Sequence, residues 1–368
     1  MAAVLKYPAK KYMRLAFDLA KKAEGRTFPN PLVGAVIVRG SRIVGSGFHK
    51  VAGSAHAEIV ALKEAGGRAK GAVLFCTFEP CSHFGRTGPC VDEIVKAGIK
   101  EVYVGMVDPN PLIRGASIEK LRLSGVKVHV GFLEKEIASL NRPFIKSMTK
   151  GLPLVTIKIA ESLDGKIATK NGESKWITSE PARRYSHGRR VFFDAIMAGA
   201  RTVISDDPGL EPGKKSGAHK LTKLIIDSEL KIPLSARLFK TRQRVIIAAV
   251  KPNKVKERLL LKRGAEVVYT KSKNGRVDLK DFLRILNKSE IRSVLVEGGS
   301  SLTGSLLDER LADRIMVYIA PKIIGGVKAL SCVGGYGAGR LSEAINMANM
   351  DLKMIGQDIL IEGDLIYS

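Results

Sequence analysis

The pattern of apolar and polar positions predicts a helix and then a hairpin at the start of the chain. Residues 11–24 carry apolar side chains at helical spacing, and Gly25 follows as a stop signal. Two apolar runs, residues 33–38 and 43–48, flank a short Arg-Gly-Ser turn. We therefore expect an amphipathic helix followed by a β-hairpin.

Helices and strands alternate through the rest of the first half. The segment AHAEIVALKEAG predicts a helix, with Ser54 as its N-cap and Gly66 just beyond its end. Further helices are predicted from Cys90 and from about Ser117. Three apolar segments between and after them predict strands: residues 72–77, 101–107 and 126–130. This alternation favours a largely parallel sheet that is covered on both faces.

The α/β pattern restarts after a short junction at Gly151 and Pro153. A fresh strand is predicted at residues 154–160. More strands are predicted near residues 195–199, 223–227, 244–250, 265–270, 293–299 and 314–321. For 368 residues, a prior of about 150 residues per domain also favours two domains. We expect α/β domains at residues 1–149 and 150–368.

Composition narrows the class of protein. No apolar run approaches the ~20 residues that span a bilayer, and charges interrupt the N-terminal segment too often for a secretory signal. The four cysteines do not make a disulfide scaffold, so metal binding or burial is expected for them. We expect a soluble, cytoplasmic protein. A net charge of +25 suits either nucleic acid or small phosphorylated ligands, and it also fits an ordinary basic surface.

One constellation carries recognisable chemistry. His56 and Glu58 stand two residues apart at a predicted helix start, Cys81 follows a proline after a strand, and Cys90 opens another helix. One imidazole and two thiolates make the ligand set of a catalytic zinc site with a fourth position left for water. Glu58 is then free to handle the proton of that water. Zinc deaminases combine HxE, Pro-Cys and a second cysteine in this way.

Two observations complicate that interpretation. Free cysteines are usually buried and inert, and His56 alone would be read as a surface residue at a helix start. In the zinc deaminase signature two residues separate the cysteines, whereas eight separate Cys81 from Cys90. A loop between two fixed ends accommodates the longer spacing, and we predict zinc (Zn²⁺) binding.

The motifs NPLVGAVIV, HAE, EPCSHFGRTGPC and DPNPL together resemble the RibD family of bifunctional riboflavin biosynthesis enzymes. The resemblance continues through TIKIAESLDGKIAT, SKWITSEPAR, ISDDPGL and VEGGSSLTGSLL. It implies a cytidine-deaminase-like α/β/α domain followed by a dihydrofolate-reductase-like α/β domain. The implied reactions are deamination of 2,5-diamino-6-(5-phosphoribosylamino)pyrimidin-4-one and then NADPH reduction of the ribosyl chain of 5-amino-6-(5-phosphoribosylamino)uracil to a ribityl chain.

The resemblance also assigns residues. It implies His56, Cys81 and Cys90 as zinc ligands and Glu58 as the proton-transferring residue. The implied deaminase substrate contacts are Asn30, His49, His83 and Arg86. The implied substrate and cofactor contacts of the reductase are Lys158, Ser174, Trp176, Thr178, Arg190, Asp206, Leu210, Glu297, Gly298, Gly299 and Ser300. The last three form a glycine turn before a helix, which can present N–H groups to a phosphate but is more often only a tight connection.

Three positions depart from the family pattern, and they keep alternatives open. Arg201 stands where a small residue is usual, Gly213 where an arginine is usual, and Ser117 where a glycine is usual. The second domain is therefore either an active reductase or a structural, dimerising domain. A nucleic-acid base deaminase is a further alternative, although it leaves the second domain unexplained. We expect a small phosphorylated pyrimidine as the partner, no nucleic acid, no membrane, and a homo-oligomer.

Overall fold

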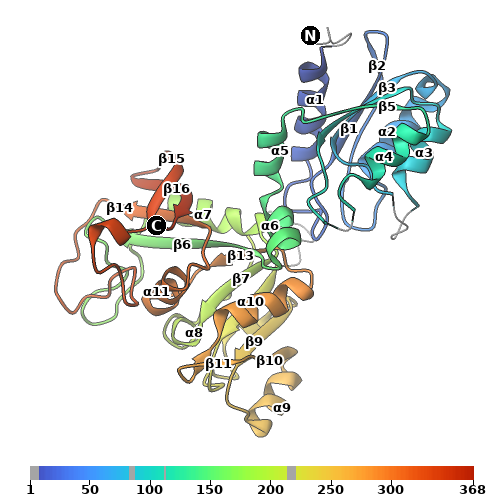
Figure 1. Cartoon of the computed structure of the whole chain (residues 1–368). Helices are drawn as coiled ribbons and strands as arrows, with labels where there is room; N and C mark the ends of the chain where they lie inside the picture. The colour runs from blue at the N-terminus through green and yellow to red at the C-terminus, as the bar shows by residue number, and fades with distance from the viewer. Residues whose placement is uncertain (1–7, 83–87, 112, 214–220) are drawn as a thin grey trace. The chain divides into compact units, whose positions relative to one another are not determined.

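The chain folds into two compact units, Met1–Gly151 and Leu152–Ser368 (Figure 1). We describe a computed structural model in which residues 8–82, 88–111, 113–213 and 221–368 are placed. The division between the units falls in the Gly-Leu-Pro junction where the α/β pattern restarts. Within the described residues, no helix has the length and apolar character needed to cross a bilayer.

The first unit contains a five-stranded sheet in the order β2-β1-β3-β4-β5. Its strands are β1 (Gly34–Arg39), β2 (Arg42–Phe48), β3 (Val73–Phe78), β4 (Glu101–Met106) and β5 (Lys127–Val130). The predicted hairpin is confirmed as β1 and β2, which pair antiparallel. Strands β3, β4 and β5 are parallel as expected, but β1 also runs antiparallel to β3. The sheet is therefore mixed, with its parallel part on the side that carries the cysteine segments.

Helices cover both faces of this sheet, as the sequence predicted. They are α1 (Ala9–Lys21), α2 (Ala57–Ala65), α3 (Cys90–Lys96), α4 (Ala116–Leu123), α5 (Glu134–Leu140) and α6 (Arg142–Lys150), with a 3₁₀ turn η1 (Gly66–Ala69). One apolar cluster joins α2, α3 and α4 to the sheet, and another joins α1 and α5 to the opposite face. Neighbouring residues of β1 divide between them, since Ile37 belongs to the first cluster and Val36 to the second.

Helix α2 lies unusually close to β2. A Cβ atom added to Gly45 would lie 2.2 Å from the carbonyl oxygen of Ala61, and one added to Gly47 would lie 2.6 Å from that of Ala57. Any larger side chain at these two positions would push the helix away. The glycines therefore set the position of the helix whose first turn carries His56 and Glu58.

The start of α2 differs from the prediction. Ser54 is not the N-cap, because its hydroxyl donates to the carbonyl of Val51 at 2.7 Å and closes a turn before the helix. Serine side chains commonly form such local bonds in competition with helix capping. His56 occupies the N-cap position and makes no side-chain cap bond, so its imidazole is available for other contacts. Gly66 ends the helix with φ 54°, as expected.

The second unit contains a nine-stranded sheet in the order β10-β9-β8-β7-β13-β6-β14-β16-β15. Its strands are β6 (Leu154–Ser162), β7 (Ala195–Gly199), β8 (Thr222–Ile226), β9 (Val245–Ala249), β10 (Ala265–Tyr269), β13 (Ser293–Val296), β14 (Arg314–Ala320), β15 (Asn346–Ile355) and β16 (Asp358–Ile366). From β10 to β14 all neighbours pair in parallel, while β16 is antiparallel to both β14 and β15. A separate small hairpin joins β11 (Ser272–Lys273) to β12 (Arg276–Val277).

Apolar clusters lie on both faces of the nine-stranded sheet. One packs against α10 (Leu279–Lys288) and α11 (Ser300–Asp308). The other includes residues of α7 (Glu180–Arg189), α8 (Ala200–Asp206), α9 (Lys254–Lys262) and the 3₁₀ turn η3 (Arg237–Lys240). Two further 3₁₀ turns are η2 (Arg190–Phe192) and η4 (Leu341–Glu343). The result is a parallel α/β layer structure extended by antiparallel strands.

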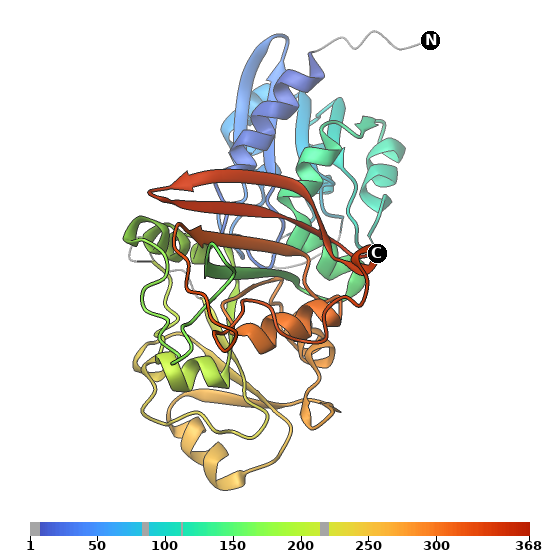
Figure 2. The ribbon, with the colours of Figure 1, turned by 90° about the vertical axis from the view of Figure 1, so that its left-hand side faces the viewer.

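The C-terminal hairpin was not predicted. Figure 2 shows β15 and β16, the red strands, side by side at one end of the second sheet. The pairing register of β15 shifts between Ala348 and Asp351, and Asn349 between them has φ 50°. Such a bulge interrupts the period-two alternation by which a strand is recognised in a sequence.

Candidate functional site

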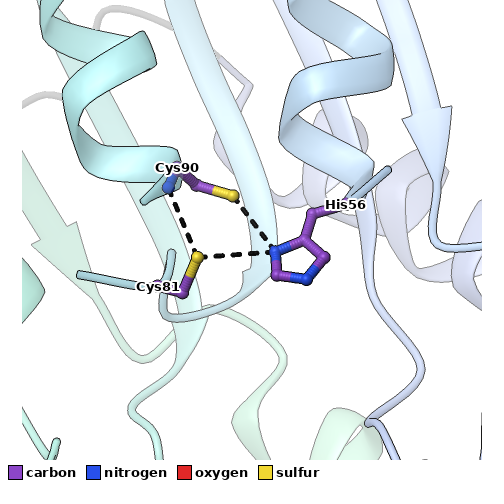
Figure 3. Close-up of side chains that lie close together, drawn as sticks. All are labelled: His56, Cys81 and Cys90. Carbon is purple, nitrogen blue, oxygen red and sulfur yellow. Dashed lines mark hydrogen bonds between the residues drawn. The ribbon is translucent and has the colours of Figure 1, made fainter. Parts of the chain in front are cut away.

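Three predicted metal ligands converge in the first unit (Figure 3). His56 comes from the start of α2, Cys81 from the segment after β3, and Cys90 from the first residue of α3. Their ligand atoms all lie within 4.8 Å of one another. Nδ1 of His56 lies 3.2 Å from Sγ of Cys90 and 3.4 Å from Sγ of Cys81. One nitrogen and two sulfur atoms in this arrangement fit a zinc ion.

The two thiols are electrostatically unequal. The pKa of Cys81 lies well below that of an ordinary thiol, because the Cys90 thiol hydrogen-bonds to it and His56 also bonds to its sulfur. The backbone N–H of Cys90 adds a third bond to the same sulfur at 3.3 Å. The same thiol contact, together with burial, raises the pKa of Cys90. A divalent cation would replace the proton that the pair shares.

Glu58 lies in the first turn of α2, and its side chain is buried. Burial raises its pKa to about 7, and the nearby charge of His56 opposes that shift only in part. A carboxyl group with a pKa in this range can both accept and release a proton near neutral pH. Glu58 therefore has the properties of a general acid–base residue beside a metal site.

Asn30 and His49, both predicted as substrate contacts, lie beside the ligand cluster. Nδ2 of Asn30 donates to Nε2 of His49 at 3.1 Å, and Nδ1 of His49 lies 3.3 Å from the carbonyl oxygen of Ala55. The ring of His49 packs edge-on against that of His56, with centroids 5.4 Å apart. Burial lowers the pKa of His49, which favours the neutral form of its ring. His83 and Arg86, the other two predicted contacts, lie outside the described residues.

A charged cluster lies at the carboxyl ends of the central strands of the second unit. Glu297 follows β13, and its two oxygens accept from Nε and Nη2 of Arg190 at 2.8 Å each. Nη1 of Arg190 donates to the carbonyl of Glu211 at 2.6 Å. Lys158 on neighbouring β6 lies near both charges, and burial lowers its pKa. The guanidinium of Arg190, expected to meet substrate, is thus engaged within the protein.

We predict that Glu297→Gln destabilises the second unit by about 3–5 kcal/mol, because Arg190 would remain buried without its carboxylate. Burial alone would raise the pKa of Glu297, but the charge and hydrogen bonds of Arg190 lower it to about 2. Its contribution to stability is therefore present above the ordinary pKa of 4.5 and is lost as the pH falls toward 2. Urea unfolding of wild type and variant at neutral pH measures the effect.

The control for this prediction is Glu266→Gln. Glu266 forms a similar bidentate pair with Arg244, but both side chains are about half exposed. Removal of an exposed pair costs about 0–1 kcal/mol. Equal losses in the two variants would contradict a framework role for the buried pair.

The glycine turn predicted to bind phosphate lies beside this cluster. Gly299 is the N-cap of α11, and Ser300 is its first residue. A Cβ atom on Gly298 would lie 2.9 Å from Cδ2 of Leu302, so a larger residue there would force the Leu302 side chain to shift. The N-terminus of α11 therefore sits at the carboxyl end of β13, where open α/β sheets bind ligands.

The other predicted reductase residues occupy several environments. Ser174 donates to Oδ1 of Asp206 at 3.3 Å. Trp176 is 62% exposed and carries the guanidinium of Arg183 4.4 Å above its ring centre, so it is not a core residue. The backbone of Thr178 accepts from the same arginine, and Leu210 is buried in the apolar cluster beneath α7 and α8.

The three residues that depart from the family pattern lie in different surroundings. Arg201 is exposed in the first turn of α8, directly after β7. A Cβ atom on Gly213 would lie 3.2 Å from the carbonyl oxygen of His187, so a side chain there would be crowded. Lys214 and Lys215, considered as substitutes, lie outside the described residues. Ser117 is buried in α4.

Sequence reasoning overlooked two residues beside these sites. His187 lies near Arg190, Glu297 and Lys158, and burial followed by the charge of Arg190 lowers its pKa. Its spacing of three residues from Arg190 on a helix was an available signal. Glu79, directly before the Pro-Cys dipeptide, is buried and accepts hydrogen bonds from the backbone of Asp108, Gly115 and Ser117. A buried carboxylate was not foreseeable from the motif alone.

Two family models match successive parts of the chain. The cytidine and deoxycytidylate deaminase zinc-binding region matches residues 6–106, and the RibD C-terminal domain matches residues 153–361. The riboflavin biosynthesis protein RibD of Aquifex aeolicus is 44% identical over 96% of this chain and 97% of its own length. That of Escherichia coli is 35% identical over 95% and 97%.

Solved structures extend the similarity to the whole fold. Acinetobacter baumannii RibD aligns with a TM-score of 0.88 at 34% identity, over 97% of this chain and 99% of the other. A Thermotoga maritima diaminohydroxyphosphoribosylaminopyrimidine deaminase/5-amino-6-(5-phosphoribosylamino)uracil reductase aligns with a TM-score of 0.83 at 35% identity, over 97% and 99%. The chain belongs to the RibD family of riboflavin biosynthesis proteins.

Proposed function

We propose that the first unit is a zinc-dependent deaminase that converts 2,5-diamino-6-(5-phosphoribosylamino)pyrimidin-4-one into 5-amino-6-(5-phosphoribosylamino)uracil and ammonia. The observation that carries this proposal is the convergence of His56, Cys81 and Cys90 beside the buried carboxyl group of Glu58. The relative from Thermotoga maritima is named for this deamination, which supports the choice of substrate.

The residues of the chain have distinct tasks in this reaction. His56, Cys81 and Cys90 would hold zinc, which when bound supplies a water of lowered pKa. Glu58 accepts one proton from the attacking water and passes it to the ring nitrogen. It then transfers the remaining hydroxyl proton of the tetrahedral adduct to the amine, so that the C–N bond breaks, the carbonyl forms and ammonia leaves. Asn30 and His49 are proposed to orient the pyrimidine, and their mutual hydrogen bond holds the Asn30 side chain in place. His83 and Arg86 remain proposed substrate contacts.

Ammonia release tests the deaminase assignment. The purified full chain is incubated with the diaminopyrimidinone phosphate before and after treatment with a chelator, and zinc is then restored. We expect release to stop with the chelator and to return with zinc. Release that continues unchanged in metal-free protein would contradict the proposal.

We propose that the second unit uses NADPH to reduce the ribosyl chain of the deaminated product to a ribityl chain. When bound, NADPH supplies the hydride. The position of the α11 N-terminus at the carboxyl end of β13 supports phosphate binding by Gly298, Gly299 and Ser300. Lys158, Ser174, Trp176, Thr178, Asp206 and Leu210 are proposed to line the substrate and cofactor site.

Arg190 and Glu297 have a different proposed role in the same site. The two side chains hydrogen-bond to each other, and Arg190 also donates to the carbonyl of Glu211. We infer that Arg190 fixes the Glu297 carboxylate near Lys158, where the negative charge opposes the lowering of the lysine pKa by burial. In this proposal Lys158 contacts the substrate or cofactor, and the Arg190–Glu297 pair affects their binding only through its effect on Lys158.

Arg201 offers a test of cofactor binding. It is exposed directly after β7, at the edge of the sheet where ligands of open α/β folds bind. If its guanidinium contacts a phosphate of NADPH, Arg201→Gly weakens binding by about tenfold, the value of one charge-assisted hydrogen bond. Fluorescence titration with NADPH measures this. Arg258→Gly, on α9, is the control, and equal Kd values in all three proteins would place Arg201 outside the site.

The alternatives lead to different results in the same experiments. A structural second unit binds no NADPH. A nucleic-acid deaminase loses polynucleotide affinity steeply with added salt, which single-stranded DNA titrations at two salt concentrations would show. Neither alternative accounts for relatives named riboflavin biosynthesis proteins whose similarity extends over both units. We therefore propose the bifunctional assignment.

We also propose that the chain forms a homo-oligomer through β15, an edge strand of the second sheet. Met350, Leu352 and Met354 alternate along one face of this strand and are each about 60% exposed. In an antiparallel pairing of two copies centred on Leu352, Asp351 would face the partner's Lys353 on the other face. This charge complementarity favours pairing of β15 with β15 of a second copy of the chain.

Leu352→Lys should therefore convert an oligomer into monomers, because it places two like charges at the centre of the pairing. Sedimentation velocity of the full chain measures the state. Leu123→Lys, at an exposed leucine of α4, is the matched control and should leave the state unchanged. A monomeric wild type, or a variant that assembles as wild type does, would contradict the proposal.

A further inference from the structure

Glu79 is a buried carboxylate whose hydrogen-bond partners are backbone N–H groups. Its Oε2 accepts from the N–H of Asp108 and from that of Gly115, both at 3.0 Å, and its Oε1 accepts from the N–H of Ser117 at 3.1 Å. Only 6% of the residue is exposed. Among the described residues, no lysine or arginine forms an ion pair with it. Three N–H donors therefore satisfy the charge.

Two of these donors belong to the start of α4. Helix N-termini leave N–H groups without partners, and an anion there is favoured by the helix dipole. Gly115 is the N-cap of α4 and has no side chain with which to cap it. Ser117 does not cap the helix with its side chain, because its hydroxyl is buried without a partner. Its backbone N–H donates to Glu79. Glu79 thus caps α4 from a different segment of the chain.

The third donor closes the other end of the same loop. Asp108 follows β4, and Ser117 lies nine residues later in α4, so one carboxylate joins both ends of this connection. The backbone N–H of Glu79 also donates to the carbonyl of Met106 at the end of β4. Glu79 therefore ties the end of β3 to the end of β4 and to α4.

This anchor stands two residues before Cys81. Pro80 between them is buried and restricts the backbone, so the position of Glu79 largely determines where the Cys81 backbone begins. On its other side, the carbonyl of Cys81 accepts from the N–H of Val91 in α3 at 3.2 Å. Cys81 is held from both directions. The two attachments come from separate helices, α4 through Glu79 and α3 directly.

We propose that Glu79 is a positioning residue that presents Cys81 to zinc. This inference rests on the proposed zinc site. Glu79 makes no contact with the ligand atoms, and it acts through the backbone of Pro80 and Cys81. Residues that orient metal ligands from outside the coordination sphere typically change metal affinity by about 10- to 100-fold when they are replaced.

The test is the zinc affinity of Glu79→Gln, measured with zinc alone by competition with a chromophoric chelator. In this variant an NH₂ group replaces one carboxylate oxygen and faces N–H donors, so at least one bond is lost. We expect the Kd for zinc to rise about 10- to 100-fold. Glu79→Asp keeps the charge but is one methylene too short to reach both ends of the loop, and we expect an intermediate Kd.

Glu64→Gln is the control for a general loss of stability. Glu64 also accepts a backbone N–H, that of Ser46 at 2.7 Å, in the same unit but away from the cysteines. The zinc affinity of Glu64→Gln should equal that of wild type. Saturating zinc should restore deaminase turnover in Glu79→Gln, because the ligands themselves remain.

The outcomes separate this inference from the proposed function. If wild type binds zinc and Glu79→Gln binds it equally well, the positioning role is wrong. If turnover of Glu79→Gln stays low when zinc is saturating, Glu79 acts on something other than metal affinity, and the inference is wrong. A wild-type chain without zinc affinity would overturn the proposed deaminase site itself.

Discussion

We expect Cys81→Ala to lose zinc and deamination together, so that ammonia release falls to the level of the metal-free wild type. Two ligands remain in this variant, and a zinc ion needs at least three protein ligands to be retained in a catalytic site. The variant also lacks the thiol with the lowered pKa, which is the one that most readily loses its proton and binds a metal as thiolate. Metal content by atomic absorption and ammonia release measure the two losses.

Cys332→Ala is the matched control. Cys332 is a half-buried cysteine of the second unit and belongs to no metal-ligand cluster among the described residues. This variant should keep one equivalent of zinc and full deaminase activity. If Cys81→Ala retains wild-type zinc and turnover, the ligand assignment is wrong. NADPH binding should persist in both variants, because the second unit has its own core.

Glu58→Gln should retain zinc and lose turnover. Glutamine has the shape of glutamate but cannot accept and release a proton, and a positioned general acid–base group contributes about 10²- to 10⁴-fold in rate. We expect kcat to fall by that factor, while the zinc content stays at one equivalent. Burial of the side chain argues that no exposed carboxylate can replace it from solvent.

The contrast between the two variants separates binding from chemistry. Loss of zinc in Glu58→Gln would make Glu58 a ligand or a support for the ligands. Normal deamination by Glu58→Gln would exclude it as the proton carrier. Glu64→Gln, six residues further along the same helix region, should behave as wild type in both assays.

The metal cluster could be predicted because its residues mark the ends of elements. His56 and Cys90 stand at helix starts and Cys81 follows a strand, so short patterns locate all three. Their combination with Glu58 in the zinc deaminase signature predicted that they would bind one metal ion. The order of the sheet was less accessible, since a hairpin does not reveal that β1 also pairs antiparallel with β3.

Contacts between distant segments were not accessible from the sequence. The Arg190–Glu297 pair spans 107 residues, and the motifs identified each residue without indicating that they bind each other. Glu79 meets donors 29 to 38 residues away. The C-terminal hairpin was missed because a bulge breaks the alternation of β15. Local sequence patterns identify candidate functional residues, whereas the partners of buried charges depend on tertiary packing.

One measurement tests the central proposal most directly. Ammonia release and NADPH oxidation are followed together after the diaminopyrimidinone phosphate is added to the zinc-loaded full chain. We predict that ammonia appears first and that NADPH oxidation follows with a lag. Glu58→Gln should strongly slow both, and only NADPH oxidation should return when the deaminated product is supplied. Ammonia release without any NADPH oxidation, even with the deaminated product present, would contradict the assignment of the second unit. Absence of both would contradict the account as a whole.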